Sequence, residues 1–304
     1  MPERPDDRPP APPPDRPGGH AGDPFSAVLA RLHAAFGEEG FQYEPGAATA
    51  ALGRTVLRFF EDTGRVFGLL VATLRGLVAL PRYAREVLNQ MYGLGVGSLP
   101  LVAVVAVFTG AVTAVQAAYQ LQGFLPQRYL GSMVAKFVLI ELGPVLTALV
   151  VGGRVGAAIA AELGTMRVTE QIDALETLAI PPVRYLVLPR FLAATVMLPV
   201  VTVFADAIGI VGGFVVANLA YGQSTHTYAE AVRHSFLSHD LFSGLTKSAF
   251  FGASIGLMGT FYGFRTEGGA EGVGKAATSA VVASCVLVLM LDYVLANLLF
   301  RTEF

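Results

Sequence analysis

Two carboxylates and an arginine interrupt one long apolar stretch of the sequence, residues 141–164 (ELGPVLTALVVGGRVGAAIAAELG). Glu141 opens the stretch, Pro144 follows within one turn, Arg154 lies near its middle and Glu162 near its end. Ionisable groups are costly inside a bilayer and usually face a cavity, a partner chain or an opposite charge. Pro144 removes a backbone hydrogen bond and can kink a helix, as the wall of a cavity requires. Glu141 is therefore the favoured functional group, whereas we expect Arg154 and Glu162 to form structural pairs.

Four further ionisable side chains lie in apolar runs: Lys136, Asp206, Lys247 and Asp292. We expect the two lysines to form structural ion pairs or to reach the membrane interface. The two aspartates and Glu141 allow an alternative function, in which three carboxylates relay ions or protons through a secondary transporter or channel. Such transporters are commonly built from internal repeats, and the two halves of this sequence show none. We recognise no pairing of a nucleophile with a base, so an enzyme is not expected.

The elements that must hold these groups are membrane-spanning helices. Hydrophobic residues make up 53% of the 304 residues and charged residues 14%, whereas soluble domains have about 25% charged residues. Five apolar runs have the roughly 20 residues that a spanning helix needs: residues 98–120, 133–164, 187–220, 241–264 and 276–300. The sequence therefore predicts an all-α integral membrane protein with five transmembrane helices. The net charge of −2 gives no indication of a nucleic-acid partner.

The chain before the first span divides into two parts. Residues 1–23 are polar and rich in proline, so we expect a disordered tail. Residues 24–97 are expected to form a cytoplasmic or interfacial helical region, and residues 98–304 the transmembrane domain. Within the first of these regions, residues 54–87 predict a basic amphipathic helix that lies in the interface. The alternative is a sixth span through residues 66–80.

A second amphipathic helix is predicted between the second and third spans, within residues 165–180 (TMRVTEQIDALETLAI). Apolar residues recur at helical spacing on one face: Val168, Ile172, Leu175 and Leu178. Thr169 can cap the start of this helix, and Pro181 and Pro182 end it. A helix of this length exceeds what a connector needs, so we favour a docking element for a cytoplasmic partner. The alternative is a connector, or an anchor of a membrane scaffold, that lies on the headgroups.

The distribution of basic residues predicts the orientation of the spans, because cytoplasmic loops carry an excess of Lys and Arg. With five spans, one side of the membrane receives most of them: residues 54–85 with their arginines, Arg167, Arg184, Arg190, Arg265 and Lys275. The other side receives Arg128, Arg233 and Arg301. The N-terminus is therefore expected in the cytoplasm and the C-terminus on the opposite side.

Small residues and two further motifs complete the pattern. Four pairs of glycines have the G-x-x-x-G spacing that lets helices approach closely: Gly152 and Gly156, Gly209 and Gly213, Gly252 and Gly256, and Gly259 and Gly263. Residues 269–276 (GAEGVGKA) resemble a phosphate-binding loop but lack its final hydroxyl residue, so we expect a flexible loop. His226, His234, His239 and Asp240 fit no standard zinc spacing, so we expect an exposed loop and no metal site.

Residues 141–191 resemble the MlaE/YrbE family, the permease subunits of lipid-transporting ABC systems associated with MCE proteins. The matching motifs are ELGPV, GR-x-G, AE-x-G-x-M-x-x-TEQ-x-x-AL, and the PR that precedes the third span. Weaker similarity covers roughly residues 92–300 and includes the LDYVL of the fifth span. The proline-rich tail is not covered.

This resemblance implies a homodimer of a five-helix permease in a bacterial inner membrane, with an interfacial helix before the first span. It also implies two cytoplasmic ABC ATPase subunits, an MCE-domain protein on the periplasmic side and often a STAS-domain protein inside. The chain itself is expected to be non-catalytic and to hold no cofactor. Its expected role is to move phospholipids between the inner membrane and the periplasm or outer membrane.

The resemblance also assigns roles to individual residues. It implies a lipid cavity at the dimer interface lined by Val115, Gln116, Ala118, Glu141 and Leu142. It implies coupling to the ATPase through Thr169, Glu170, Gln171, Ile172 and Leu175. Structural roles within the second span are expected for Pro144, Gly152, Arg154, Gly156 and Glu162. Some family members have a basic residue where this chain has Ile140, and Lys136, one turn earlier, could restore that charge.

Overall fold

The computed structural model describes residues 45–121 and 126–300, and this part of the chain is helical without a β-strand. The chain divides into two units, residues 1–59 and 60–304. The described part of the first unit, residues 45–59, forms the beginning of α2 (Pro45–Gly76). The predicted tail, residues 1–23, lies outside the described residues.

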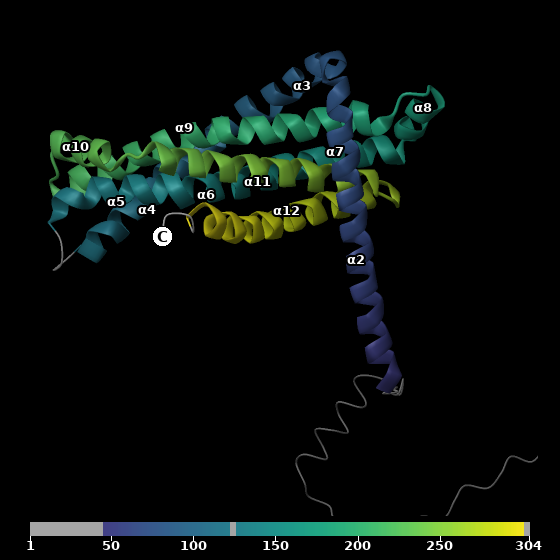
Figure 1. Cartoon of the computed structure of the whole chain (residues 1–304), viewed down its shortest axis with the longest axis horizontal. Coiled ribbons are helices and arrows are strands. Elements are labelled where there is room, and N and C mark those ends of the chain that lie inside the picture. The colour runs from purple at the N-terminus through teal and green to yellow at the C-terminus, as the bar shows by residue number, and fades with distance from the viewer. Residues whose placement is uncertain (1–44, 122–125, 301–304) are drawn as a thin grey trace, which may run out of the picture. The chain divides into compact units, whose positions relative to one another are not determined.

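Five helical segments of the second unit are long and apolar enough to cross a membrane, as predicted (Figure 1). They are Leu80–Leu121, Leu130–Val168, Val183–Tyr221, Ser238–Phe264 and Gly269–Leu299. The short helix α8 (Gln171–Thr177) lies at one end of these helices, and α10 (Thr225–Ser235) lies at the opposite end.

The segment before the first span differs from the single helix predicted over residues 54–87. A 3-10 turn, Leu77–Ala79, separates α2 from α3 (Leu80–Gly95). Pro81 explains the break, because a proline has no N–H to donate and is best accommodated in the first turn of a new helix. The helix α3 packs against α9 (Leu188–Tyr221) and buries Val87.

The helix α9 forms the centre of the bundle. It packs against α4 (Leu99–Leu121) and against α11 (Ser238–Phe264). The helix α11 in turn contacts α12 (Gly269–Phe300) and α7 (Ala157–Val168), the last part of the second span. Figure 1 shows these long helices lying side by side, so groups far apart in sequence can meet between them.

Glycines explain how closely α9 meets its neighbours. A Cβ added at Gly110 would lie 1.7 Å from the carbonyl oxygen of Gly209, and one at Gly252 would lie 2.3 Å from that of Ala194. Only glycine leaves room for such backbone contact. The predicted close packing is therefore found within one chain for the pairs on α9 and α11. Gly152 differs, because a Cβ there would make ordinary contacts of 3.5 Å with Ile255.

Two segments that were expected to be loops are helices. Residues 225–235 form α10, whose N-cap Ser224 accepts a hydrogen bond from the N–H of Thr227 at 3.2 Å. Residues 269–276, the segment that resembles a phosphate-binding loop, form the first turns of α12. Both expectations were wrong, because polar and glycine-rich composition favours loops only until tertiary contacts or capping decide otherwise.

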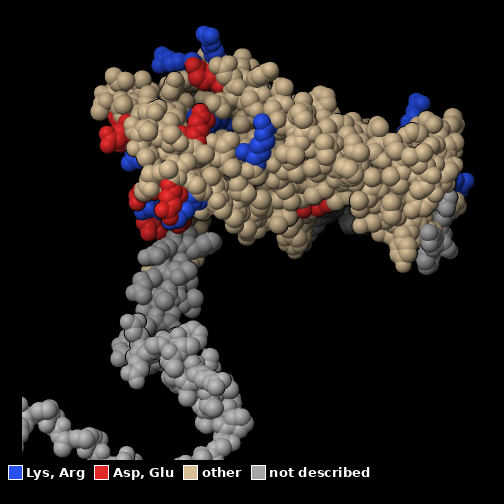
Figure 2. Space-filling view, turned by 180° about the vertical axis from the view of Figure 1, so that it is seen from behind, with Lys and Arg blue, Asp and Glu red and all other residues tan. Residues whose placement is uncertain are grey.

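The surface of the bundle has the character of a membrane protein. In Figure 2, Lys, Arg, Asp and Glu gather toward the two ends, and most of the surface between them is uncharged. Large apolar side chains are exposed on the spans, including Phe108, Leu219 and Leu289. Lipid chains can cover such side chains at no cost, whereas water cannot.

Candidate functional site

A buried lysine joins three spans by bonding two carboxylates, one of which is Glu141. The side chain of Lys247 on α11 is fully buried. Its Nζ donates to Glu141 Oε2 at 2.6 Å and to Asp292 Oδ1 at 2.9 Å. We call Glu141, Lys247 and Asp292 the charge network; they come from the second, fourth and fifth spans.

The charge network is stable only as a set. A buried ammonium must be paired and hydrogen-bonded to offset the loss of its hydration. Two carboxylates around one ammonium leave a formal charge of −1, which Lys247 alone cannot neutralise. The network reaches the surface at Glu141, whose side chain is 42% exposed, whereas that of Asp292 is 16% exposed. Glu141 is therefore the most accessible member of the charge network.

A local irregularity of the second span positions Glu141. The residues Val138–Leu142 form a π-helical turn between α5 (Leu130–Phe137) and α6 (Gly143–Val151), and Gly143 donates its N–H to the carbonyl of Val138. Pro144 has no N–H to bond the carbonyl four residues earlier, so the turn widens at this point. Such π turns occur frequently at functional sites.

Asp206 approaches the same turn from α9 but does not belong to the charge network. Its side chain is buried, and a Cβ added at Gly143 would lie 1.7 Å from Asp206 Oδ1. That oxygen has no hydrogen-bond partner in the described structure. Gly143 is therefore needed to admit the aspartate. Of the three carboxylates in the alternative ion relay, Glu141 and Asp292 are joined through Lys247. The third, Asp206, lies against α6.

The five residues predicted to line a lipid cavity do not share one pocket within the single chain. Val115 and Gln116 are exposed on α4, next to the exposed Tyr119. Ala118 is buried in the core of the same chain. Leu142 lines a small pocket between α4, α6 and α9, together with Val102, Val105, Thr109, Gly143, Leu146 and Ala205.

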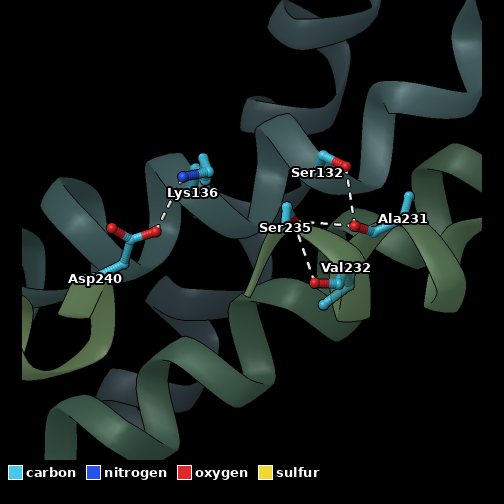
Figure 3. A network of polar contacts seen from close by, with 6 residues as sticks. All are labelled: Ser132, Lys136, Ala231, Val232, Ser235 and Asp240. Carbon is cyan, nitrogen blue, oxygen red and sulfur yellow. Dashed lines mark hydrogen bonds and ion pairs between the residues drawn. The ribbon is translucent and has the colours of Figure 1, made fainter. Parts of the chain in front are cut away.

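Lys136 forms a structural ion pair, as expected, and so does not restore the positive charge that some family members carry next to Glu141. Figure 3 shows its Nζ beside Asp240 of α11, at 3.1 Å from Oδ2. In the same region the Ser132 hydroxyl donates to the carbonyl of Ala231 at 2.9 Å. These bonds fasten α10 and the start of α11 to α5. Asp240 was expected in an exposed loop, but it is 5% exposed, and its carboxylate is compensated by Lys136 and by its place in the first turn of α11.

The predicted coupling segment has a different local structure from the one expected. The helix α7 continues to Val168, and Thr169 ends it instead of capping the next helix. The Thr169 hydroxyl donates back to the carbonyl of Thr165 at 2.8 Å. Glu170 then adopts a left-handed conformation with φ of 59° and precedes α8. The expectation that Thr169 caps α8 was wrong, because α7 is longer than the apolar pattern indicated.

The apolar face of α8 divides into a buried and an exposed part. Ile172 is 1% exposed and Leu175 is half-buried, and both pack in a core to which all five spans contribute. Leu178 is 69% exposed, and Glu170 and Gln171 are also exposed. The first two residues therefore fix α8 to its own chain, and the exposed residues are the ones accessible to a partner.

The remaining predicted structural residues have polar partners. Glu162 Oε1 forms an ion pair with Arg190 Nη2 at 2.9 Å, and Arg190 also donates to the carbonyl of Leu186 at 2.8 Å. Arg154 donates to the Ser98 hydroxyl at 3.0 Å, which joins the second span to the turn between α3 and α4. Both contacts link helices within the chain. No group of three or more potential metal ligands occurs among the residues that were searched, which are the described ones.

The left-handed residues that flank α8 give a test of this geometry. Ala179 has a φ of 57°, and the N–H of Ile180 bonds the carbonyl of Leu175 at 3.0 Å. An alanine in this conformation costs about 1 kcal/mol, which glycine does not. We expect Ala179→Gly to raise the midpoint of thermal unfolding slightly. Ala174→Gly, within α8, is the matched control and should lower stability by about 1 kcal/mol. Equal losses in both variants would contradict the strained conformation.

Comparison with known proteins gives one consistent result. The family model of the permease MlaE matches residues 87–298. A probable ABC transporter permease protein of Rickettsia felis is 37% identical over 251 residues, covering 83% of this chain and 97% of the relative. The intermembrane phospholipid transport system permease protein MlaE of Haemophilus influenzae is 35% identical over 252 residues, with the same two coverages of 83% and 97%. The chloroplastic protein TRIGALACTOSYLDIACYLGLYCEROL 1 of Arabidopsis thaliana is 34% identical over 239 residues, covering 77% of this chain and 68% of the relative.

Proposed function

The chain belongs to the MlaE permease family, and we propose that it is the membrane-spanning subunit of an ABC transporter that moves phospholipids. The observation that carries this proposal is the family match over residues 87–298, which contains nearly all of the five spans. A multi-pass protein of the inner membrane follows from the same match. The chain would supply the path for the lipid, and ATP hydrolysis would take place in a separate cytoplasmic subunit.

The orientation proposed for the chain places α8 in the cytoplasm. Basic residues gather at the end of the bundle where α8 lies, and the following ones are exposed there: Arg167, Arg184, Arg265 and Lys275. Such residues are retained on the cytoplasmic side of a membrane. The N-terminus would then be cytoplasmic and the C-terminus periplasmic, with α10 facing the periplasm.

The ATPase would dock on the exposed part of α8. Glu170, Gln171 and Leu178 offer charged, polar and apolar contacts beside one another. Ile172 and Leu175 would transmit the movement, because they pack in the same core as the spans. A displacement of α8 by the ATPase would therefore move α7 and, through it, the second span that carries Glu141.

The lipid would bind at an interface between two copies of the chain. Val115 and Gln116 are exposed side by side on α4, and Glu141 is the exposed member of the charge network. In a homodimer these side chains could line one cavity, which neither copy forms alone. An MCE-domain protein at the periplasmic end and a STAS-domain protein on the ATPase are the further partners that we propose.

Co-purification with the cognate ATPase tests the docking surface. We expect Glu170→Lys combined with Leu178→Asp to weaken ATPase binding by at least about tenfold, since both changes alter exposed contacts at the proposed interface. The matched control is Glu230→Lys combined with Leu237→Asp, which makes the same exchanges near α10, at the opposite end of the bundle. Leu237 is 53% exposed. This control should retain the ATPase.

Two results would overturn the proposal. Equal ATPase binding by both double variants would exclude α8 as the docking site. Ion or proton flux through liposomes that contain this chain alone, without lipid transfer in the presence of the ATPase and ATP, would favour the secondary transporter instead. In that event Glu141 and Asp292, already joined by Lys247, would be the first residues to examine.

A further inference from the structure

Three arginines surround an open pocket where the chain enters its first span. The pocket has a volume of about 620 Å³, and its lining residues are Arg75, Val78, Pro81, Arg82 and Arg184. They come from the end of α2, the turn after it, the start of α3 and the π-helical turn Val183–Val187. A volume of this size is ample for a small ligand or a lipid headgroup. We call this set the arginine pocket.

The arginine pocket is held together by specific contacts. The Cγ atom of Arg184 would lie 3.6 Å from a Cβ added at Gly76, so its aliphatic stem passes directly over that glycine. The rings of Tyr83 and Tyr185, the residues that follow Arg82 and Arg184, meet edge to face with centroids 6.1 Å apart. The N–H of Arg184 is also bonded to the carbonyl of Pro181 at 3.1 Å. These contacts hold the backbone segments that carry Arg82 and Arg184 beside the end of α2, so that the three arginines line one space.

The arginine pocket lacks a counter-charge. None of its three arginines takes part in an ion pair within residues 60–121 and 126–300, and no acidic residue lines the pocket. Other arginines toward the same end are paired, Arg167 with Asp173 and Arg265 with Asp62. Three guanidinium groups around one space repel one another unless an anion lies between them. Arginine is well suited to bind phosphate, because its planar fork can donate two parallel hydrogen bonds.

The neighbouring surface is apolar, which indicates an amphiphilic ligand. Val78 lines the pocket and is 90% exposed, and Leu74 is 46% exposed one turn earlier. The pocket lies beside the start of Leu80–Leu121, the first segment that is long and apolar enough to span a membrane. Arginines with exposed apolar neighbours favour the boundary between headgroups and acyl chains. A free anion would use the arginines but leave these apolar side chains uncovered. A phospholipid would satisfy both.

We propose that the arginine pocket binds the phosphate of an anionic phospholipid of the cytoplasmic leaflet, with Val78 against its acyl chains. The assignment to that leaflet rests on the proposed orientation of the chain. This lipid is distinct from a transported one, because Glu141 lies in the third of the second span that is farthest from α8, whereas the arginine pocket lies at the end near α8. Since Arg184 follows α8 closely in the chain, a bound lipid would restrain the segment that leads from α8 into the third span.

Lipid binding to the purified full-length chain tests the proposal. The probes are short-chain phosphatidylglycerol, short-chain phosphatidylcholine and inorganic phosphate, each added to protein in a neutral detergent. The test variant carries Arg75→Gln, Arg82→Gln and Arg184→Gln. We expect its affinity for phosphatidylglycerol to fall on the order of 100-fold, because each arginine near an anionic surface contributes about fivefold. Phosphatidylcholine should bind the wild type much more weakly.

Two control variants make the result specific. Arg65→Gln, Arg167→Gln and Arg265→Gln remove three exposed arginines that are each paired with a carboxylate, and this variant should bind phosphatidylglycerol as the wild type does. Replacing the three pocket arginines with lysine keeps the charge but removes the paired donors, so its affinity should lie between those of the wild type and the glutamine variant. This second variant also serves if the glutamine variant fails to fold, because the wild-type and lysine proteins can still be compared with each lipid.

Several outcomes would overturn the proposal. An equal loss in the pocket variant and in the paired-arginine variant would show a general charge effect. Equal binding of both lipids by the wild type would exclude recognition of the anionic headgroup. If inorganic phosphate binds the pocket with the same dissociation constant as phosphatidylglycerol, the ligand is a free anion and not a lipid. ATPase co-purification is measured on the same samples, so failure of this site and failure of the transporter assignment are distinguished.

Discussion

Lys247→Met is expected to lower the free energy of unfolding by about 3–5 kcal/mol, because it removes one partner from a buried ionic set. Glu141 and Asp292 would then face each other without the ammonium that now bonds both, at 2.6 and 2.9 Å. Methionine has a similar length and fits the space, so the loss reports charge and not volume. Thermal unfolding in detergent or nanodiscs, followed by the amount of monodisperse protein, measures the effect.

Two further variants distinguish the loss of this buried ionic set from a general effect of removing a lysine. Lys275→Met removes an exposed lysine whose pair with Glu271 is 75% and 79% exposed, and it should change stability by less than about 1 kcal/mol. Adding Glu141→Gln and Asp292→Asn to Lys247→Met removes the unbalanced charge and should restore most of the lost stability. A Lys247→Met protein as stable as the wild type would show that the network does not hold the three spans together.

Gly110→Ala is expected to prevent α4 from packing on α9, although it adds a single methyl group. The added Cβ would lie 1.7 Å from the carbonyl oxygen of Gly209 and 2.9 Å from the backbone nitrogen of Gly213. Both contacts are with backbone, which cannot rotate away as a side chain can. Overpacking typically costs about 1–3 kcal/mol, and the upper part of this range is expected here because two helices must separate.

Gly153→Ala is the matched control for this substitution, because a Cβ at Gly153 would meet nothing within 4 Å. Alanine also has a higher helix propensity than glycine, by about 1 kcal/mol. We therefore expect the control to be neutral or stabilising in the same unfolding measurement. If Gly110→Ala unfolded at the wild-type temperature, the close approach of α4 and α9 would be wrong.

The membrane-spanning segments could be predicted from the sequence because their signal is local. A run of about 20 apolar residues is a property of the run itself, since the bilayer requires that length wherever the helix packs. The second to fifth predicted spans agree with the helices of the structure to within seven residues at each end, whereas the first helical segment begins at Leu80 and not at residue 98. The motifs of the second span similarly sufficed to indicate the family, because they are read in order along the chain.

The partners of the charged residues could not be predicted in this way. Lys247 was expected to form a structural pair, but its partners lie 106 and 45 residues away in the sequence. Which face a residue occupies depends on the rotation of its helix. Each π turn adds one residue to the helix, and this rotates the following faces by about 100°. The second span contains two such turns, Val138–Leu142 and Gly152–Gly156, so a regular 3.6-residue period cannot predict which helix Glu141 or Arg154 faces.

The sequence by itself determined the class of the protein, the number of its spans and its family, because each depends on composition or on residues close in the chain. Tertiary structure alone decided which groups meet. It paired Lys136 with Asp240 and Lys247 with Glu141, and it buried Ile172 while leaving Leu178 exposed. The physical reason is that a buried charge or an apolar face is stabilised by whatever surrounds it, and those surroundings come from distant segments brought together only by packing.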